Sequence, residues 1–307
     1  MSLSFPRIRI GEPIRHESLT VYPLLSEGGR PVDYMLADEA ISASKATVKE
    51  VNEQGTVPEL LVENHGDVRI LFLEGEELRG AKQNRVLNTS LLIPAKSTVK
   101  IPVSCVEQGR WRFKSAEFIS GGTSSPSALR YALKASVTRS LKLSQSHRSD
   151  QGAVWQEVHK QQQDLGVSSP TAAMADTFKK HAGRVGDYQE KLKYQEGSFG
   201  VAVAIGSKLV SLDLFDKPST CRQVWSRLLS GFSLDALLTK PEEMVPASSE
   251  VDQRLHEAIG VSWERAEAVG EGEEYRAEFG SSQGSALSLM GDLVHLSVML
   301  DRNAEHD

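Results

Sequence analysis

Cysteine and long apolar segments are scarce in this sequence, and their scarcity excludes several classes of protein. Cys105 and Cys221 are the only cysteines among 307 residues, too few for the disulfide framework of a small secreted domain. The longest apolar-rich run, Phe199 to Ile205, is far shorter than a membrane-spanning helix. The first twenty residues contain no apolar core of a signal peptide. We therefore expect a soluble, cytoplasmic protein without a membrane partner.

Motifs for metals and nucleotide cofactors are lacking as well. The eight histidines form no His-x-x-x-His pair and there is no Cys-x-x-Cys, so nothing predicts a zinc site. The Gly-x-Gly-x-x-Gly of dinucleotide-binding folds and the Gly-x-x-x-x-Gly-Lys-Ser/Thr of phosphate-binding loops are also missing. We predict no metal and no cofactor. His295, which alternates with the apolar Val294 and Leu296, is interpreted as an ordinary strand histidine.

Charge is unevenly distributed along the chain. The net charge of −6 provides no general basic surface, so we expect no nucleic-acid partner. Residues 126–193 carry eleven Lys or Arg against six Asp or Glu, whereas residues 241–307 carry fifteen acids against four arginines. The basic middle and the acidic end either attract each other within one molecule, attract each other between two copies in a homo-oligomer, or form two separately solvated faces.

Apolar periodicity divides the chain into three parts and predicts an α+β fold. We expect a β-rich domain over residues 1–122, a helical insertion over 123–197, and a small C-terminal unit of β-hairpin, helix and β-hairpin over 198–307. The last unit is expected to pack as one body with the first. Gly-led turns predict hairpins at Gly66-Asp67, Gly206-Ser207 and Gly291-Asp292. The Gly- and Ser-rich segment 119–127 is interpreted as a flexible linker.

Helices are predicted from periodicity and from capping residues. Apolar residues four positions apart indicate an amphipathic helix, and they are Leu129, Leu133, Val137 and Leu141. Arg130 and Lys134 lie on its other faces. The starts of further helices are predicted at Ser149, at Ser169-Pro170 and at Thr220.

The first candidate site is a polar cluster between two predicted strands, Glu74 to Arg85. Its twelve residues include three acids, three bases, two amides and two glycines. Two interpretations remain open. In one, the acids and bases pair with each other and staple the loop. In the other, the segment recognises a ligand, with Lys82 and Arg85 on an anion and with Gln83 and Asn84 on a base or sugar.

The second candidate site, Ser104 to Arg112, follows a predicted strand. Side-chain alternation along that strand places Cys105 on the apolar face, which favours a buried cysteine acting as a small hydrophobe. A nucleophilic thiolate beside Arg110 is the alternative. Gly109 allows a turn that brings Arg110 back toward Glu107.

A last short strand is expected at Trp111 to Phe113, with the two aromatic side chains toward the core. Alternation then places three cations on the opposite face, and they are Arg110, Arg112 and Lys114. Such a face suits an anion, because arginine binds phosphate and carboxylate groups through a planar fork. The alternative is a solvated strand face. Gln108 would contribute a polar contact to a bound molecule.

Carboxylates in the two clusters suggest a catalytic alternative. If folding brings Glu76 and Glu107 together, either could act as a general base, with Cys105 as a less favoured nucleophile. The distance between the two carboxylates is the quantity that separates this hypothesis from simple binding.

The sequence resembles a bacterial family, the ARG and rhodanese-phosphatase-superfamily-associated protein domain. The resemblance rests on four stretches: Gly75 to Arg85, Ile101 to Trp111, Asp150 to Trp155, and Leu212 to Asp216. The family is named for gene neighbours that include ADP-ribosylglycohydrolases and rhodanese-like phosphatases. The resemblance implies a setting in ADP-ribose, nucleotide or phosphate metabolism, including bacterial conflict systems. It supplies no catalytic residues.

We therefore predict a protein that binds or senses a small anionic ligand bearing phosphate, such as a nucleotide or an ADP-ribose derivative. The third stretch adds Asp150, Gln151 and Trp155 to the candidate ligand-binding residues. A hydrolase or transferase acting on a similar substrate is the first alternative. A structural or interaction protein, whose clusters are internal ion-pair networks, is the second.

Overall fold

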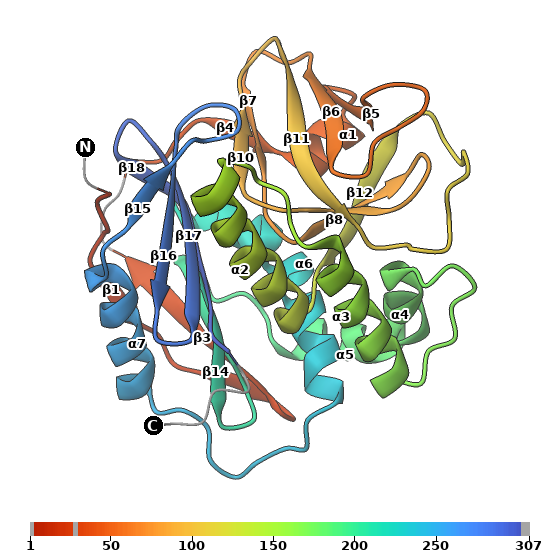
Figure 1. The fold of residues 1–307 in the computed structure, drawn as a ribbon. Coiled ribbons are helices and arrows are strands. Elements are labelled where there is room, and N and C mark those ends of the chain that lie inside the picture. Colours follow the sequence, from red (N-terminus) through yellow and green to blue (C-terminus); the bar gives the residue numbers. More distant parts are fainter. Residues whose placement is uncertain (1–2, 27–29, 302–307) are drawn as a thin grey trace.

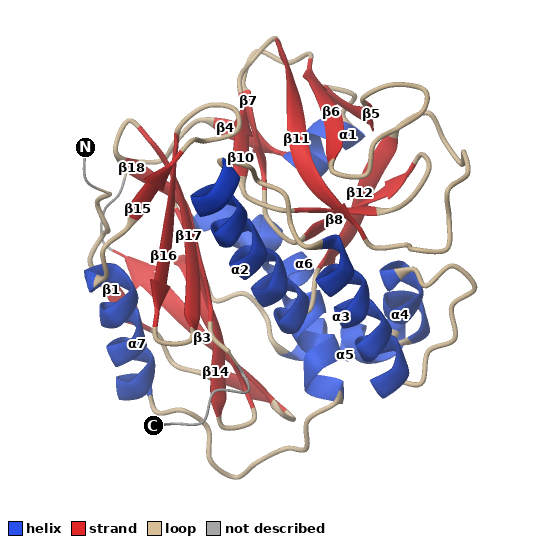
Figure 2. Ribbon diagram, in the orientation of Figure 1, coloured by secondary structure: helices blue, strands red, loops and turns tan. Residues whose placement is uncertain are grey.

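The computed structural model describes residues 3–26 and 30–301, which form three β-sheets and seven helices (Figure 1). This confirms the mixed α+β class predicted from the sequence. Helices lie between and below the sheets, and strands from the two ends of the chain lie in the same sheet (Figure 2).

The nine-stranded sheet consists of β1 (Ile8–Ile10), β2 (Ile14–His16), β3 (Leu19–Ser26), β13 (Ser198–Ile205), β14 (Lys208–Phe215), β15 (Glu264–Ala266), β16 (Glu273–Phe279), β17 (Ser282–Leu289) and β18 (Asp292–Met299). Its order is β1-β3-β13-β14-β18-β17-β16-β15, with β2 beside β3. All these pairs are antiparallel. Strand β3 therefore pairs with a strand more than 170 residues away, because Leu24 lies opposite Gly200.

The middle of the chain forms the other two sheets. The six-stranded sheet consists of β5 (Ala46–Glu50), β6 (Glu59–Asn64), β8 (Glu76–Gly80), β9 (Arg85–Leu87), β11 (Ser97–Cys105) and β12 (Phe118–Ser124), in the order β12-β8-β9-β11-β6-β5. The three-stranded sheet consists of β4 (Tyr34–Leu36), β7 (Arg69–Phe72) and β10 (Leu91–Ile93), with β7 in the centre. The chain passes between these two sheets more than once, so several covalent connections join the six-stranded sheet to the three-stranded sheet.

The seven helices are α1 (Ala37–Ser42), α2 (Ser127–Ser144), α3 (Gln151–Asp164), α4 (Met174–Lys180), α5 (Ala182–Lys191), α6 (Pro218–Leu237) and α7 (Ser248–Gly260). Helix α6 is buried along most of its length and packs against β13 and β12. Gly231 permits this close approach, since a Cβ atom there would lie 2.3 Å from the carbonyl oxygen of Ser125. Proline in its first turn costs α6 no hydrogen bond.

Two of the three predicted hairpins are confirmed. Strands β13 and β14 are joined by Gly206-Ser207, with a φ of 62° at Gly206. Strands β17 and β18 are joined by Met290-Gly291, one residue earlier than predicted. Both turn residues have positive φ, which is the backbone that a tight hairpin turn of right-handed twist requires.

The hairpin predicted at Gly66-Asp67 is wrong, because β6 and β7 belong to different sheets. The side chain of Asn64 explains the difference. Its amide nitrogen donates to the carbonyls of Val68 and Pro94, and its oxygen accepts the N–H of Gly66. These side-chain hydrogen bonds fix the turn by which the chain leaves one sheet and enters the next. In a hairpin, backbone pairing between the two strands would fix the turn instead.

The linker predicted over residues 119–127 is also wrong, because most of it is strand β12, paired with β8. A bulge between Ser120 and Ser124 accommodates the glycines. A Cβ atom at Gly121 would lie within 2.9 Å of Glu77, and Gly122 has a φ of 67°. The glycines thus permit close contact within a strand rather than flexibility.

Helix starts differ from the prediction by a few residues. Asp150, not Ser149, caps α3, accepting the N–H groups of Gly152 and Ala153. Ser169 accepts the N–H of Ala173 in the turn before α4 instead of opening a helix itself.

Candidate functional site

The two predicted clusters meet at one corner of the six-stranded sheet. The loop between β8 and β9 lies against the end of β11, where Asn84 N donates to Glu107 Oε2 at 3.1 Å. Gln83 Nε2 donates to the Glu107 carbonyl at 3.2 Å, and Val106 N donates to the Asn84 carbonyl. We call residues 81–85 together with 105–112 the Arg85 corner.

Glu107 and Arg110 form a buried ion pair within this corner. Arg110 Nη2 lies 2.6 Å from Glu107 Oε2, so the turn predicted at Gly109 is confirmed. Arg110 also donates to the carbonyls of Gly80 and Ala81. Burial alone would raise the pKa of Glu107, but the donors Arg110 and Asn84 outweigh it and lower that pKa. Both terminal nitrogens of Arg110 therefore have partners within the protein, whereas its Nε has no acceptor among the described residues.

Arg85 has fewer partners than Arg110, because two of its guanidinium nitrogens lack an acceptor among the described residues, against one in Arg110. The side chain is 0% exposed, and its Nη1 donates to Gln83 Oε1 at 2.9 Å. Within the described residues, Nε and Nη2 have no hydrogen-bond acceptor. Glu50 Oε1 is 3.9 Å from Nη2, beyond hydrogen-bond distance. Burial lowers the pKa of Arg85, despite the opposing effects of Cys105 and Glu50.

The strand predicted at Trp111 to Phe113 is a loop, and its faces are the reverse of the prediction. Trp111 is 48% exposed and Phe113 72%, whereas Arg110 is 6% exposed. Contacts with buried partners hold Arg110 inside, so the aromatic side chains project outward. Lys82 Nζ and Arg85 Cζ lie 5.5 and 5.7 Å from the centre of the Trp111 ring. Trp111 therefore covers Arg85.

The other candidate cations and amides of the corner are less involved. Lys82 donates to the backbone carbonyls of Glu53 and Gln54 at 2.5 and 2.6 Å. Gln108 and Arg112 are exposed. The face of three cations predicted for this segment does not form, because Arg110 points inward and the other two point to solvent.

Cys105 joins the third sequence stretch to the corner. Its N–H and carbonyl are both hydrogen-bonded by the Gln151 side chain, at 2.8 and 2.9 Å. Burial raises the pKa of the Cys105 thiol, although the Glu107 N–H, Arg85 and the Trp155 indole favour the thiolate. The thiol is 0% exposed, as predicted for a cysteine that acts as a small hydrophobe. Asp150 caps helix α3, as described above.

Glu76 lies in a different ion-pair group. Its Oε1 is 2.7 Å from Arg227 Nε, and Arg227 also binds Asp38. Burial raises the pKa of Glu76, and the charge of Arg227 only partly offsets it. Across residues 3–26 and 30–301, no hydrogen bond or ion pair joins Glu76 to Glu107 or to a shared partner. Their joint role in acid/base chemistry stays a prediction.

A second charged group, which the sequence did not predict, lies between α2 and the nine-stranded sheet. Arg130 and Lys134 are both buried, although they stand outside the apolar stripe of α2. Arg130 Nη2 is 2.6 Å from Asp213 Oδ1, and Lys134 Nζ binds Glu74 Oε1. Ser285 Oγ, the fifth member, accepts from Lys134 and donates to Glu74 at 2.7 Å. We call this group the α2 network.

His295 belongs to the α2 network and is more than an ordinary strand residue. Its Nδ1 is 2.9 Å from Ser90 Oγ, and its Nε2 is 3.6 Å from Asp213 Oδ1. Its ring stacks on Phe215 with centroids 4.9 Å apart. The signal in the sequence was a polar alternation along β14, β17 and β18, at Ser211, Asp213, Ser285, His295 and Ser297. Such alternation normally indicates a solvated face, but here α2 covers it.

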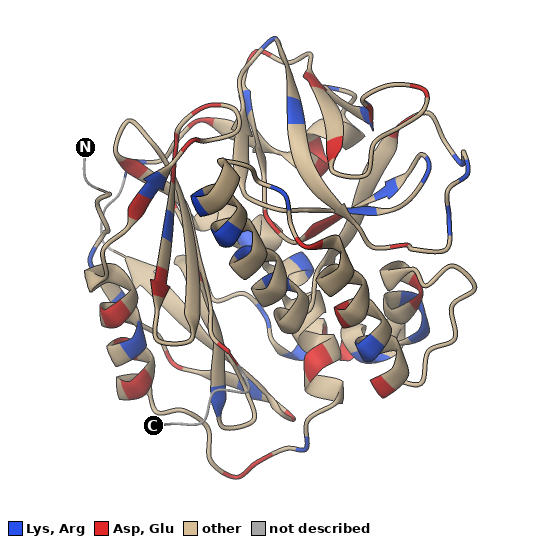
Figure 3. Cartoon of the chain, in the orientation of Figure 1, with Lys and Arg blue, Asp and Glu red and all other residues tan. Residues whose placement is uncertain are grey.

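Ion pairs also join the basic middle of the chain to its acidic end. Lys142 binds Glu278 and lies 3.8 Å from Glu264, and His147 Nε2 is 2.8 Å from Glu274. Figure 3 shows basic residues along α2 beside the charged strands β15 and β16. Of the three alternatives for the uneven charge, attraction within one molecule is thus present.

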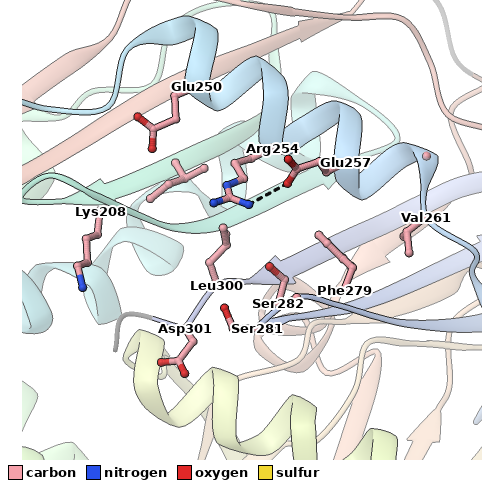
Figure 4. A pocket seen from close by; sticks show the side chains of 13 residues that line it. Lys208, Glu250, Arg254, Glu257, Val261, Phe279, Ser281, Ser282, Leu300 and Asp301 are labelled. Atoms are coloured by element: carbon pink, nitrogen blue, oxygen red, sulfur yellow. Dashed lines mark hydrogen bonds and ion pairs between the residues drawn. The ribbon is translucent and has the colours of Figure 1, made fainter. Parts of the chain in front are cut away.

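A cavity of about 800 Å³ lies elsewhere, beside α7 (Figure 4). Its wall carries the pair Arg254–Glu257, at 2.9 Å, and Lys208, and none of the predicted site residues line it. Ser282, also in the wall, belongs to a Gly-x-Ser-x-Gly stretch over 280–284. That stretch forms the tight turn between β16 and β17, not the strand-to-helix elbow of hydrolases.

Neither a membrane-spanning helix nor a metal cluster is found in residues 3–26 and 30–301. No helix of this part is long and apolar enough to cross a membrane. No three His, Cys, Asp or Glu side chains of the same residues gather as ligands for a metal ion.

Comparison with known proteins identifies the family. The family model described as ARG and Rhodanese-Phosphatase-superfamily-associated Protein domain matches residues 7–299, nearly the whole chain. Comparisons with curated proteins and with solved structures find no match. The family resemblance inferred from the four sequence stretches is confirmed: the chain belongs to the ARG and Rhodanese-Phosphatase-superfamily-associated Protein domain family.

Proposed function

We propose that the protein binds a small phosphate-bearing molecule, of the nucleotide or ADP-ribose type, at the Arg85 corner. One observation carries the proposal: the buried Arg85 guanidinium has two nitrogens without a hydrogen-bond acceptor in the described part of the chain. A buried donor without a partner costs about 1–3 kcal/mol, so proteins seldom retain one. A phosphate oxygen is the partner that suits a guanidinium fork best.

The position of Trp111 supports a ligand that also carries a flat ring. The Arg85 and Lys82 cations lie over the indole, and nearly half of the side chain is open to solvent. Stacking of one base on an aromatic side chain contributes about 1–3 kcal/mol. A phosphate on Arg85 and a base on Trp111 would therefore use adjacent groups of one small site.

Access to Arg85 requires the covering loop to move. The loop is held at two points, where Gly109 N donates to Thr171 O at 2.8 Å and Lys114 N donates to Ala81 O at 3.0 Å. Arg110 is a further buried anchor, and between it and Lys114 the side chains of residues 111–113 are exposed. A segment with few contacts between two fixed points can open at low cost, as many binding-site loops do.

A second candidate is a structural or interaction role, in which the clusters only hold the sheets together. The pairing of Glu107 with Arg110 and of Glu76 with Arg227 favours it, because these charges are already satisfied within the chain. Ligand binding separates the two candidates directly.

Calorimetric titration with ADP-ribose, ADP and inorganic phosphate tests the proposal. We expect ADP-ribose to bind, and at about 100 times its Kd to stabilise the fold by about 2.7 kcal/mol. Trp111→Ala should weaken ADP-ribose binding by about tenfold, through loss of stacking. It should not weaken inorganic phosphate binding, since phosphate has no ring to stack and the variant uncovers Arg85.

Phe113→Ala is the matched control, because Phe113 is an exposed aromatic residue of the same loop that does not cover Arg85. It should bind all three ligands as the wild type does. Absence of binding by all three ligands to the folded wild-type protein would rule out the proposal. Equal ADP-ribose affinity in the two variants would remove Trp111 from the site.

A further inference from the structure

A smaller pocket, of about 240 Å³, opens between the C-terminal end of α2 and strands β15 and β16. Its wall includes Thr138, Leu141, Lys142, Arg265, Ala266 and Arg276. None of the residues of the Arg85 corner line it, so a ligand site in this pocket is independent of the proposed function.

Two buried polar side chains in this wall have atoms without partners. Arg276 is 3% exposed; its Nε donates to Glu274 at 2.8 Å and its Nη2 to Thr89 at 2.9 Å. Its Nη1 has no hydrogen-bond acceptor among the residues that the structure describes. Thr138, 1% exposed, likewise has no partner for Oγ1 in that part of the chain. Two side chains that line one pocket thus each hold a buried polar atom without a partner.

The charge of the wall argues against a multiply charged anion. Three cations line the pocket, namely Lys142, Arg265 and Arg276, against the two acids Glu264 and Glu267. Each cation also pairs with an acid outside the wall: Lys142 with Glu278, Arg265 with Glu273 and Arg276 with Glu274. The unpartnered donors call for acceptor oxygens, and a single carboxylate supplies them with less charge than a doubly charged phosphate.

We propose that this pocket binds a small organic carboxylate. Its carboxylate accepts hydrogen bonds from Arg276 Nη1 and from the Thr138 hydroxyl, and its short apolar body lies against Leu141 and Ala266. A volume of about 240 Å³ lies below the roughly 300–1,000 Å³ of pockets that hold drug-sized ligands, so the body is short.

Titration with acetate, propionate and butyrate, followed by NMR or calorimetry, measures the apolar contribution. Burial of one methylene contributes about 0.8 kcal/mol, so affinity should rise about fourfold with each added carbon. Butanol, which has one more carbon in its apolar body but no carboxylate, should bind far more weakly. No binding of butyrate at about 50 mM, or equal binding of butyrate and butanol, would overturn the proposal.

Two isosteric substitutions locate the site. Thr138→Val removes the hydroxyl from the pocket wall, and we expect it to weaken butyrate binding about fivefold or more. Thr177→Val is the matched control, because Thr177 is also buried with an unpartnered Oγ1 in the described chain but does not line the pocket. Replacing an unpartnered hydroxyl by a methyl group leaves the fold nearly unaffected, so both variants remain measurable.

Ala266→Trp fills the pocket and should abolish butyrate binding. Arg276 is left unchanged in these tests, because it also holds Glu274 and Thr89. Equal butyrate affinity in the Thr138 and Thr177 variants, or full binding by Ala266→Trp, would show that the carboxylate binds elsewhere and would end the proposal.

Discussion

Replacing Lys134 by methionine tests the α2 network most directly. In Lys134→Met, the Glu74 carboxylate stays buried but loses the cation that binds Oε1. Arg130 Nη2, 3.7 Å from the same oxygen, is the cation that remains. Removing one partner of a buried ion pair costs about 3–5 kcal/mol, because the other charge is left without compensation. Since Arg130 compensates in part, we expect a loss of about 3 kcal/mol at pH 7.

The pKa of Glu74 gives a second measure of the same interaction. Burial would raise this pKa, but the charges of Lys134 and then Arg130 outweigh it and hold it at about 2, against 4.5 for an ordinary glutamate. A difference of about 2.5 corresponds to about 3–4 kcal/mol, at about 1.4 kcal/mol for each pH unit. The pKa of Lys134 is lowered to about 8, because burial outweighs the attraction of Glu74, so the pair as a whole contributes less than the Glu74 shift alone indicates.

The sign of the pH dependence follows from the lowered pKa. An acid whose pKa is lower in the folded state stabilises the fold above its unfolded pKa, and that contribution is lost as the pH falls through the folded value. For Glu74 the window runs from pH 4.5 down to about pH 2. The stability difference between the wild type and Lys134→Met should thus be greatest above pH 5 and should shrink across this window.

Urea unfolding at pH 7, 4 and 3 measures these differences. Lys142→Met is the matched control: it lies on the same helix, is 47% exposed and pairs with Glu278 at the surface. An exposed pair contributes under about 1 kcal/mol, so this variant should resemble the wild type. If Lys134→Met at pH 7 were as stable as Lys142→Met, the reasoning about the α2 network would be refuted.

Close packing and burial determine three other outcomes. Gly231→Ala should destabilise the fold by several kcal/mol, because its Cβ would meet the carbonyl oxygen of Ser125, and a melting temperature equal to wild type would contradict this. Gly186→Ala, in α5, has no atom within 4 Å of the added Cβ and should stabilise by about 0.5–1 kcal/mol in the same assay. The thiols of Cys105 and Cys221 are buried and have raised pKa values. A coloured thiol reagent should therefore label neither thiol in the native protein and both after unfolding. Rapid labelling of Cys105 in the native protein would show that the Arg85 corner opens freely.

Local signals in the sequence predicted those elements whose stability is local. The turn at Gly206 and the helix beginning near Thr220 depend on residues next to each other in the chain, and both are present. The Glu107–Arg110 pair of the Arg85 corner was also predictable, because the two residues are only three positions apart. The turn at Gly66-Asp67 was predicted wrongly because Asn64, next to it, binds the carbonyl of Pro94, which is distant in the sequence.

The α2 network could not be predicted from alternation. A strand with one polar face shows the same period of two whether water or a charged helix covers that face. Lys134 and Arg130 likewise resemble surface residues of an amphipathic helix, since lysine and arginine are seldom buried without a partner. Their partners Glu74 and Asp213 stand 60 and 83 residues away, and only the fold brings them within reach.

The pairing of β3 with β13 has a consequence for synthesis on the ribosome. Leu24 emerges early, but its partner Gly200 is added 176 residues later. At roughly 5–20 residues per second, the edge of β3 waits about 10–35 seconds for that partner. During this interval the six-stranded sheet, whose strands are all translated by residue 124, can already assemble. Nascent chains shorter than about 200 residues would therefore expose the unpaired edge of β3. We expect chaperones that bind the nascent chain to bind at this strand.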